Sequence, residues 1–116
     1  MKKLYIVKKT KDFEDIINNG TNLKNKLFVV HCKKNNLPYD RFGISVSKKL
    51  GNAVFRNYYK RIIRSIIDNY KKDYVNSKDY IIILRKEAIS KSYSELEKEL
   101  IALLNKEGKD DEKQEN

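Results

Sequence analysis

The chain has 116 residues, of which 26 are Lys or Arg and 16 are Asp or Glu, giving a formal net charge of +10. This length allows one compact domain with a modest core. No apolar run approaches the roughly 18 residues that a membrane span requires. No apolar stretch near the start is long enough for export, so we expect a cytoplasmic protein that does not bind a membrane. The single Cys32 agrees with a reducing compartment.

The positive charge is concentrated in the middle of the chain. Residues 41–72 hold nine cations and one acid, Asp68, whereas residues 87–116 hold five cations and nine acids. A solvated surface usually mixes both signs, so this segment favours a polyanion as partner. A membrane surface is the alternative polyanion. It is disfavoured because the basic segment lacks Trp and its apolar side suits a protein core.

The first predicted element is a short amphipathic helix over residues 12–19. Apolar residues at i, i+3 and i+4 share one face of this helix, namely Phe13, Ile16 and Ile17. Gly20 follows at a position where glycine commonly ends a helix. A further edge strand is expected near Lys24 or Tyr5. This helix therefore presents one apolar face for packing.

Two strands are predicted next. Residues 26–33 alternate, and the face of this strand away from Phe28 holds Val29 and His31. A turn follows, and residues 41–47 form the second strand. The small polar residues that share one face of it are Ser45 and Ser47. Such small and polar residues are unusual for a face that packs in a core.

A long basic helix is predicted from about residue 53 to residue 72. Gly51 and Asn52 form the turn before it, and the Asn52 side chain can accept a hydrogen bond from an early helix amide. At about 100° per residue, polar and cationic side chains fall within one arc and apolar ones within the opposite arc. The residues of the polar arc are Arg56, Asn57, Lys60, Arg61 and Arg64.

The remaining elements complete an order of α-β-β-α-β-α in one α+β domain with a mixed sheet packed by helices. Residues 78–86 contain a continuous apolar run and indicate a central strand that is buried on both faces. A last helix begins after Ser92 and ends near Gly108. We expect the domain to span residues 1–105, and residues 106–116 to form a disordered charged tail.

The chain lacks the side chains that usually cleave a phosphodiester. Clustered carboxylates are absent from the basic segment, where Asp68 is alone. His31 is the only histidine, so acid–base cleavage by two histidines is excluded. His31 and Cys32 are neighbours in a strand and point to opposite faces, so they do not form a zinc site. We expect no catalytic residue in the protein, and no metal or cofactor bound by the protein alone.

A basic surface by itself does not distinguish RNA from DNA. A helix-turn-helix protein would place another helix directly before the basic one, whereas a strand precedes it here. This order favours an α+β RNA-binding domain. A general RNA-binding or ribosome-associated protein without a processing role stays open as the alternative. A duplex DNA binder and a metal-independent nuclease are weaker alternatives.

The residues around the basic helix resemble a known family. Residues 43–57, which read GISVSKKLGNAVFRN, resemble the signature of the bacterial ribonuclease P protein subunit. Residues 60–64 continue this signature in register, and the segments 13–20 and 79–83 are similar at compatible spacing. The resemblance covers about residues 8–105. A strand-loop-helix motif of this length is highly specific.

The resemblance implies an accessory subunit of a ribonucleoprotein that removes the 5′ leader of precursor tRNA. In that family the RNA subunit performs the hydrolysis with Mg²⁺, and the protein binds this RNA and the leader. It also implies a left-handed βαβ crossover in the sheet. No obligate protein partner is expected.

The resemblance further implies two sets of contact residues. The RNA-binding loop and helix would use Lys48, Lys49, Asn52, Arg56, Asn57, Lys60, Arg61 and Arg64. A leader-binding cleft would use Phe13, Ile17, Val29, His31, Ser45, Ser47, Arg85 and Lys86. The chain departs from the family pattern at Tyr58, where arginine is usual, and at Ile17 and His31, where aromatic residues are common. Tyr58 removes one cationic contact and adds a ring that can stack or pack.

Overall fold

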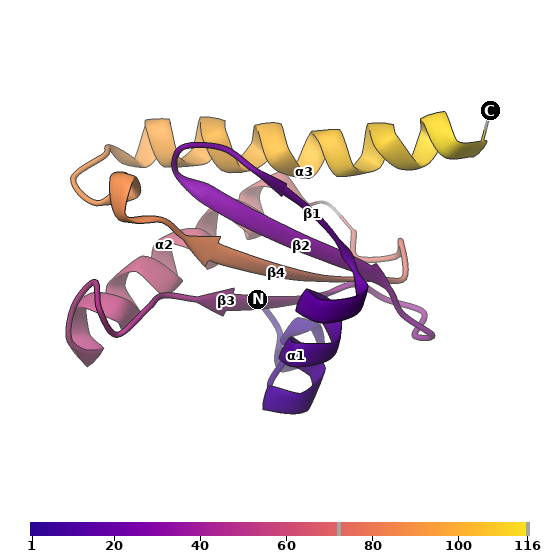
Figure 1. The fold of residues 1–116 in the computed structure, drawn as a ribbon, viewed down its shortest axis with the longest axis horizontal. Helices are drawn as coiled ribbons and strands as arrows, with labels where there is room; N and C mark the ends of the chain where they lie inside the picture. Colours follow the sequence, from indigo (N-terminus) through magenta and orange to yellow (C-terminus); the bar gives the residue numbers. More distant parts are fainter. Residues whose placement is uncertain (72, 116) are drawn as a thin grey trace.

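The computed structural model describes residues 1–71 and 73–115, with side chains up to residue 106. A four-stranded mixed sheet forms the centre, with the order β1-β2-β4-β3, and helices cover both of its faces (Figure 1). The elements are α1 (Thr10–Asn19), β1 (Thr21–Lys24), β2 (Phe28–Lys34), β3 (Arg41–Ser45), α2 (Ala53–Tyr70), β4 (Lys78–Leu84) and α3 (Tyr93–Glu115), with 3-10 turns at Lys3–Tyr5 and Lys86–Ala88. The predicted α+β class and element order are confirmed, and β1 is the expected edge strand.

The last strand of the chain lies inside the sheet. β4 pairs antiparallel with β2 and parallel with β3, and β1 pairs antiparallel with β2. The parallel neighbours β3 and β4 are joined through α2. In Figure 1 both arrows point the same way, β4 lies above β3, and α2 passes behind the sheet. This path makes the crossover left-handed, whereas nearly all βαβ connections are right-handed.

Two hydrophobic clusters lie on the two faces of the sheet. Ile82 of β4 belongs to the larger cluster, together with Ile66 of α2 and Leu100 of α3. Ile81, its neighbour in the strand, belongs to the smaller cluster with Ile16 of α1. Alternate side chains of a strand point to opposite faces, so β4 contributes to both cores. The prediction of a central strand buried on both sides is confirmed.

Two element ends differ from the prediction. The strand predicted over residues 41–47 is β3, and it stops at Ser45. Ser47 already belongs to a turn, because its carbonyl accepts from the Leu50 amide at 3.0 Å. α3 continues past Gly108 to Glu115. Helix propensities explain this extension, since Lys, Glu and Gln favour helix and one glycine costs only about 1 kcal/mol. The division of the chain into a domain and a tail at residue 106 stays a prediction.

No helix in the described part of the chain is both long and apolar enough to cross a bilayer. The cytoplasmic location stays a prediction.

Candidate nucleic-acid interface

The loop between β3 and α2 is shaped by short-range contacts. The Asn52 side chain accepts from the Phe55 amide at 3.0 Å and so caps α2, as predicted. Gly51 is required here, because a Cβ atom at this position would lie 2.4 Å from Cδ1 of Phe55. The loop leaves Lys48 and Lys49 exposed beside the helix N-terminus. The positive end of the helix dipole therefore adds to two free lysines.

α2 buries one side and exposes the other. Tyr59, Ile63, Ile66 and Ile67 are its buried residues, and they pack into the larger cluster. The predicted RNA-binding residues lie on the loop and the open side of the helix. Those that are exposed are Lys48, Lys49, Asn52, Asn57, Arg61 and Arg64, and those that are half-buried are Arg56 and Lys60. We call the six cations of this set the α2 cationic face.

The α2 cationic face has no internal counter-charge. Within the described residues, none of its six cations forms an ion pair with a carboxylate. Asp68, the one acid of the basic segment, accepts instead from the Met1 amino group and the Tyr74 hydroxyl, each at 2.8 Å. The acidic residues after 106 lie outside the described side chains. The face therefore keeps its full charge within the described structure.

Arg56 adds an unsatisfied donor to this face. Its Nε is buried and has no hydrogen-bond partner among the described residues. A buried donor without a partner costs free energy, and an oxyanion from a bound molecule would satisfy it. Because this atom is buried, an external acceptor reaches it only after the Arg56 side chain moves.

A strip of three residues crosses the sheet on the face that carries α1. Val29 of β2 pairs with Ile83 of β4, and Ile83 pairs with Ser45 of β3. All three are half-buried, so α1 covers this row incompletely. We call this row the sheet strip. Ile83 was missed in the sequence, because only the insertion of β4 between β2 and β3 brings it between two predicted site residues.

The adjacent row lies under α1. His31, Ile81 and Gly43 pair across β2, β4 and β3. A Cβ atom on Gly43 would lie 2.6 Å from Cζ of Phe13 and 2.7 Å from Cδ1 of Ile81, so the Phe13 ring packs directly over this glycine. Ile17 is 38% exposed at the outer side of α1. Phe13 and His31 therefore lie beside the sheet strip, and their role in binding a leader stays a prediction. Spacing along the chain did not reveal that Gly43 lies under the Phe13 ring.

The other predicted cleft residues lie toward the end of β4. Ser47 is exposed in the turn after β3, and Lys86 is exposed in a 3-10 turn. The Arg85 guanidinium donates to the Asn25 carbonyl at 2.8 Å, which fixes its position without neutralising it. An open cavity of about 660 Å³ lies beside it, lined by Lys24, Asn25, Lys26, Arg85 and Glu87. The cations at 24 and 26 were not singled out in the sequence.

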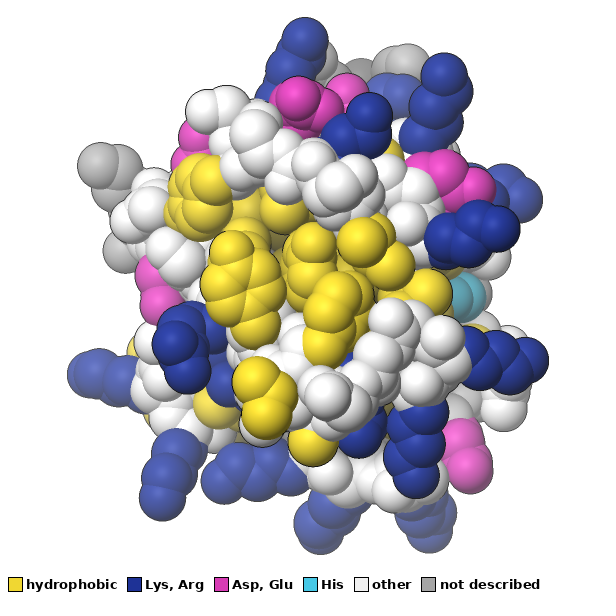
Figure 2. All heavy atoms as spheres, turned by 90° about the vertical axis from the view of Figure 1, so that its left-hand side faces the viewer, with side chains coloured by type: hydrophobic (Ala, Val, Ile, Leu, Met, Phe, Trp, Pro, Cys, Tyr) yellow, Lys and Arg dark blue, Asp and Glu magenta, His cyan; other side chains and the backbone are white. Residues whose placement is uncertain are grey.

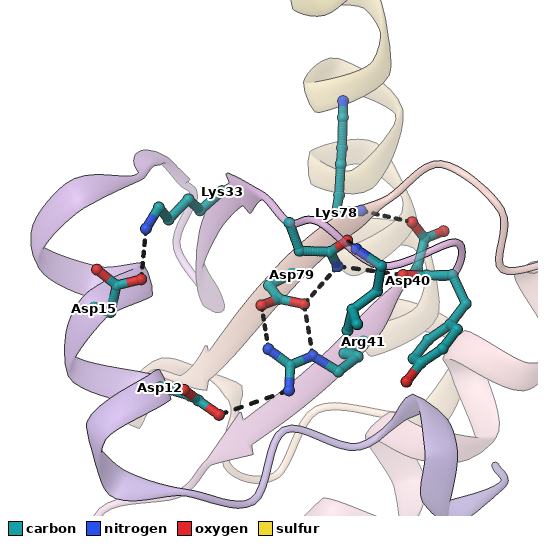
Figure 3. Close-up of polar contacts among 10 residues, drawn as sticks. Asp12, Asp15, Lys33, Asp40, Arg41, Lys78 and Asp79 are labelled. Carbon is teal, nitrogen blue, oxygen red and sulfur yellow. Dashed lines mark hydrogen bonds and ion pairs between the residues drawn. The ribbon is translucent and has the colours of Figure 1, made fainter.

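Charged side chains hold α1 against the sheet (Figure 3). Arg41 donates from Nε and Nη2 to the Asp79 carboxylate at 2.9 and 2.6 Å, and its Nη1 lies 3.6 Å from Asp12 of α1. Lys33 donates to Asp15 of α1. Hydrogen bonds from Lys33 and from a neighbouring amide lower the pKa of Asp15. These pairs keep α1 beside the sheet strip.

His31 presents a neutral ring to this region. Its Nδ1 is buried and makes no hydrogen bond to any described residue. Burial lowers the pKa of His31 below its usual 6.5, so the imidazole is uncharged at pH 7. A neutral ring stacks on a nucleobase without adding charge.

The described residues contain no group of three or more His, Cys, Asp or Glu that could hold a metal ion. The expectation that the protein alone binds no metal stays a prediction.

These features define a basic α+β protein with an unpaired cationic helix beside a partly open sheet. A family model described as Ribonuclease P matches residues 1–108. The chain is 43% identical over 109 residues to the ribonuclease P protein component of a Geobacillus strain, covering 93% of this chain and 94% of that one. It is 47% identical over 104 residues to the component of Streptococcus pneumoniae strain Hungary19A-6, covering 90% and 85%.

Solved structures agree with this assignment. The RNase P protein of Staphylococcus aureus superposes with a TM-score of 0.80 at 39% identity, covering 87% of this chain and 93% of that one. The Thermotoga maritima protein gives a TM-score of 0.76 at 33% identity, covering 83% and 91%. The chain therefore belongs to the family of ribonuclease P protein components. Membership implies a role in the 5′ processing of tRNA.

Proposed function

We propose that this chain is the accessory protein of ribonuclease P, which binds the catalytic RNA through the α2 cationic face and holds the 5′ leader of precursor tRNA along the sheet strip. The observation that carries the proposal is the set of six cations without carboxylate partners in the described structure. Each such cation can neutralise one phosphate and release a counterion. An RNA partner therefore stabilises a surface that repels itself in the free protein.

In this proposal the chemistry belongs to the RNA subunit, which holds the Mg²⁺ that supports hydrolysis. The protein contributes binding and orientation. Its one histidine has no second histidine to act with it in acid–base cleavage. We assign no catalytic residue to the protein and no further obligate protein partner to the complex.

The leader would bind by contacts that do not depend on base identity. The sheet strip offers half-buried apolar and hydroxyl groups, and two flat rings, Phe13 and His31, lie beside it. Stacking on rings tolerates any base, because every base has a π face. Such a surface fits leaders of varied sequence.

A cleavage assay tests the proposal. Transcribed ribonuclease P RNA of the Geobacillus relative is incubated with precursor tRNA at a series of Mg²⁺ concentrations, with and without this protein. We expect the protein to lower the Mg²⁺ concentration at half-maximal cleavage, and to strengthen binding of leader-bearing tRNA more than of leaderless tRNA. The protein without the RNA should not cleave.

Two outcomes would contradict the proposal. Cleavage by nuclease-free protein alone would place the chemistry in the protein. Equal binding of leader-bearing and leaderless tRNA, with no change in the Mg²⁺ requirement, would favour the general RNA-binding alternative. Lys98→Ala on the exposed surface of α3 is the matched control, because it removes one cation that lies beside Lys26 and Leu27 and is no member of the α2 cationic face, and it should leave both readouts unchanged.

A further inference from the structure

An exposed apolar pair interrupts the polar side of α2. Val54 is 78% exposed and Tyr58 is 55% exposed. They lie four residues apart, so their side chains are neighbours on the helix. Figure 2 shows this end of the molecule, where hydrophobic side chains gather in the middle and Lys and Arg side chains lie around them. Tyr58 thus interrupts a helix side that also carries the exposed Arg61 and Arg64.

The Tyr58 ring has a rigid support. It stands nearly perpendicular to Tyr59, at 88° with ring centroids 5.4 Å apart. Tyr59 is only 7% exposed, its ring packs against Phe55 at 4.9 Å, and its hydroxyl accepts from the Ser90 amide at 3.4 Å. Tyr58 keeps this contact and is still 55% exposed, so part of its surface is open toward solvent. The ring is positioned before any ligand binds.

The neighbours of Tyr58 determine which kind of molecule can bind to its exposed surface. Arg61 lies three residues later on the same side of the helix, is exposed, and has no carboxylate partner in the described structure. A second copy that paired through this same face would bring its own α2 cations against these cations and would be repelled. A nucleotide complements both groups, since its base is flat and its phosphate is anionic.

We infer that Tyr58 is a stacking platform for one unpaired base of the ribonuclease P RNA, with Arg61 on the adjacent phosphate. The inference rests on the proposed function, namely that α2 binds this RNA. A base within a duplex already stacks on both sides, so the platform selects a nucleotide in a loop, bulge or junction. The site therefore reads the shape of the RNA in addition to its charge.

Substitutions at position 58 separate stacking from charge. Binding to the transcribed Geobacillus ribonuclease P RNA is measured over a salt series for wild type, Tyr58→Phe, Tyr58→Leu and Tyr58→Ala. Stacking predicts near-wild-type affinity for the phenylalanine variant, and an affinity about 5- to 100-fold weaker for the leucine and alanine variants. The slope of log affinity against log salt should stay unchanged, because no phosphate contact is lost.

A photocrosslinker placed at position 58 locates the base. With p-benzoylphenylalanine there, we expect crosslinks to nucleotides that chemical probing shows to be unpaired. The same group at Val75, which is 64% exposed and lies beyond the C-terminal end of α2, is the control, and should not give these crosslinks. Crosslinks confined to paired nucleotides would overturn the inference.

The other outcomes are also decisive. Wild-type affinity of Tyr58→Ala, or equal affinity of the leucine and phenylalanine variants, would overturn stacking. If stacking is overturned but Arg61→Ala still weakens binding, the proposed function stands without the stacking inference. If neither substitution matters, the assignment of α2 to this RNA fails as well. If the wild-type protein self-associates and Tyr58→Ala makes it monomeric, the ring contacts a second copy of the chain instead of RNA, and the inference is overturned.

Discussion

Two regions of this molecule differ in whether their cations contact carboxylates of the same chain. Around α1 and the start of β4, Arg41, Lys33 and Lys71 each contact a carboxylate of the same chain. On the α2 cationic face, residues such as Arg61 and Arg64 have no carboxylate partner in the described structure. The first group stabilises the fold, and the second group is available to a partner.

Burial explains why two of these carboxylates, Asp40 and Asp79, must be paired. Asp40 and Asp79 are 0% and 5% exposed, and a buried carboxylate needs both hydrogen bonds and counter-charge. Asp40 accepts from the Lys78 amide at 2.9 Å (Figure 3). It also accepts from Lys71 Nζ at 3.2 Å. The exposed cations of α2 keep their water and need no partner for folding. The difference predicts which substitutions change stability and which change binding.

The largest effect is expected from Asp79→Ala. This substitution removes the bidentate partner of the half-buried Arg41 and should lower the free energy of unfolding by about 3 kcal/mol. Urea denaturation measures it. Asp12→Ala is the control, because this carboxylate is half-exposed and 3.6 Å from Arg41, so its loss should cost less than about 1 kcal/mol. Equal losses in the two variants would contradict the pairing assigned here.

Removing two cations from α2 should act on binding alone. We expect the double variant Arg61→Ala/Arg64→Ala to bind ribonuclease P RNA at least about tenfold more weakly, and to lower the salt slope by roughly 2, because two phosphate contacts are lost. Its free energy of unfolding should stay within about 0.5 kcal/mol of wild type. Filter binding over a salt series and urea denaturation measure the two quantities. The Lys91→Ala/Lys98→Ala variant on the α3 side controls for net charge, and an equal slope change there would reject a localised interface.

The free protein should be stabilised by salt. Screening by sulfate or NaCl reduces repulsion among the α2 cations, and we expect a gain of about 1 kcal/mol between low salt and 0.5 M. Thermal or urea unfolding at several salt concentrations measures this gain. The gain should shrink in Arg61→Gln/Arg64→Gln, which keeps polar side chains and removes the charge. An unchanged salt response in that variant would show that the repulsion lies elsewhere.

The smallest effect concerns His31. Burial lowers the pKa of this ring in the folded protein, so the unfolded chain binds more protons near the ordinary pKa of 6.5. Well above pH 6.5, His31 therefore does not change the free energy of unfolding. As the pH drops below 6.5, protonation of the unfolded chain lowers that free energy. Urea denaturation at pH 7.5 and 5.5 should show a larger loss for wild type than for His31→Gln. A variant with the same pH response as wild type would mean that the ring stays well solvated.

The α2 cationic face could be predicted closely from the sequence. Its cations recur with the helical period, and the Asn52 cap that starts α2 depends on a residue only three positions away. Local spacing was sufficient because a helix orders its own surface. The contact roles of these residues stay predictions.

The sheet strip could be predicted only in part. The faces of Val29 and Ser45 follow from alternation within each strand, yet the pairing of both with Ile83 depends on β4 entering between β2 and β3. Likewise, the need for glycine at position 43 is explained only by the Phe13 ring that packs over it in the folded chain. Spacing along one strand carries no information about which strand lies next to it.

The order of residues alone thus determined the helix with its charged side, the apolar core positions and the family. Tertiary structure decided which carboxylates neutralise which cations, and which three strands share a row. The physical reason is range: helical periodicity and caps act between residues a few positions apart, whereas ion pairs and sheet register join segments that only the folded chain brings into contact.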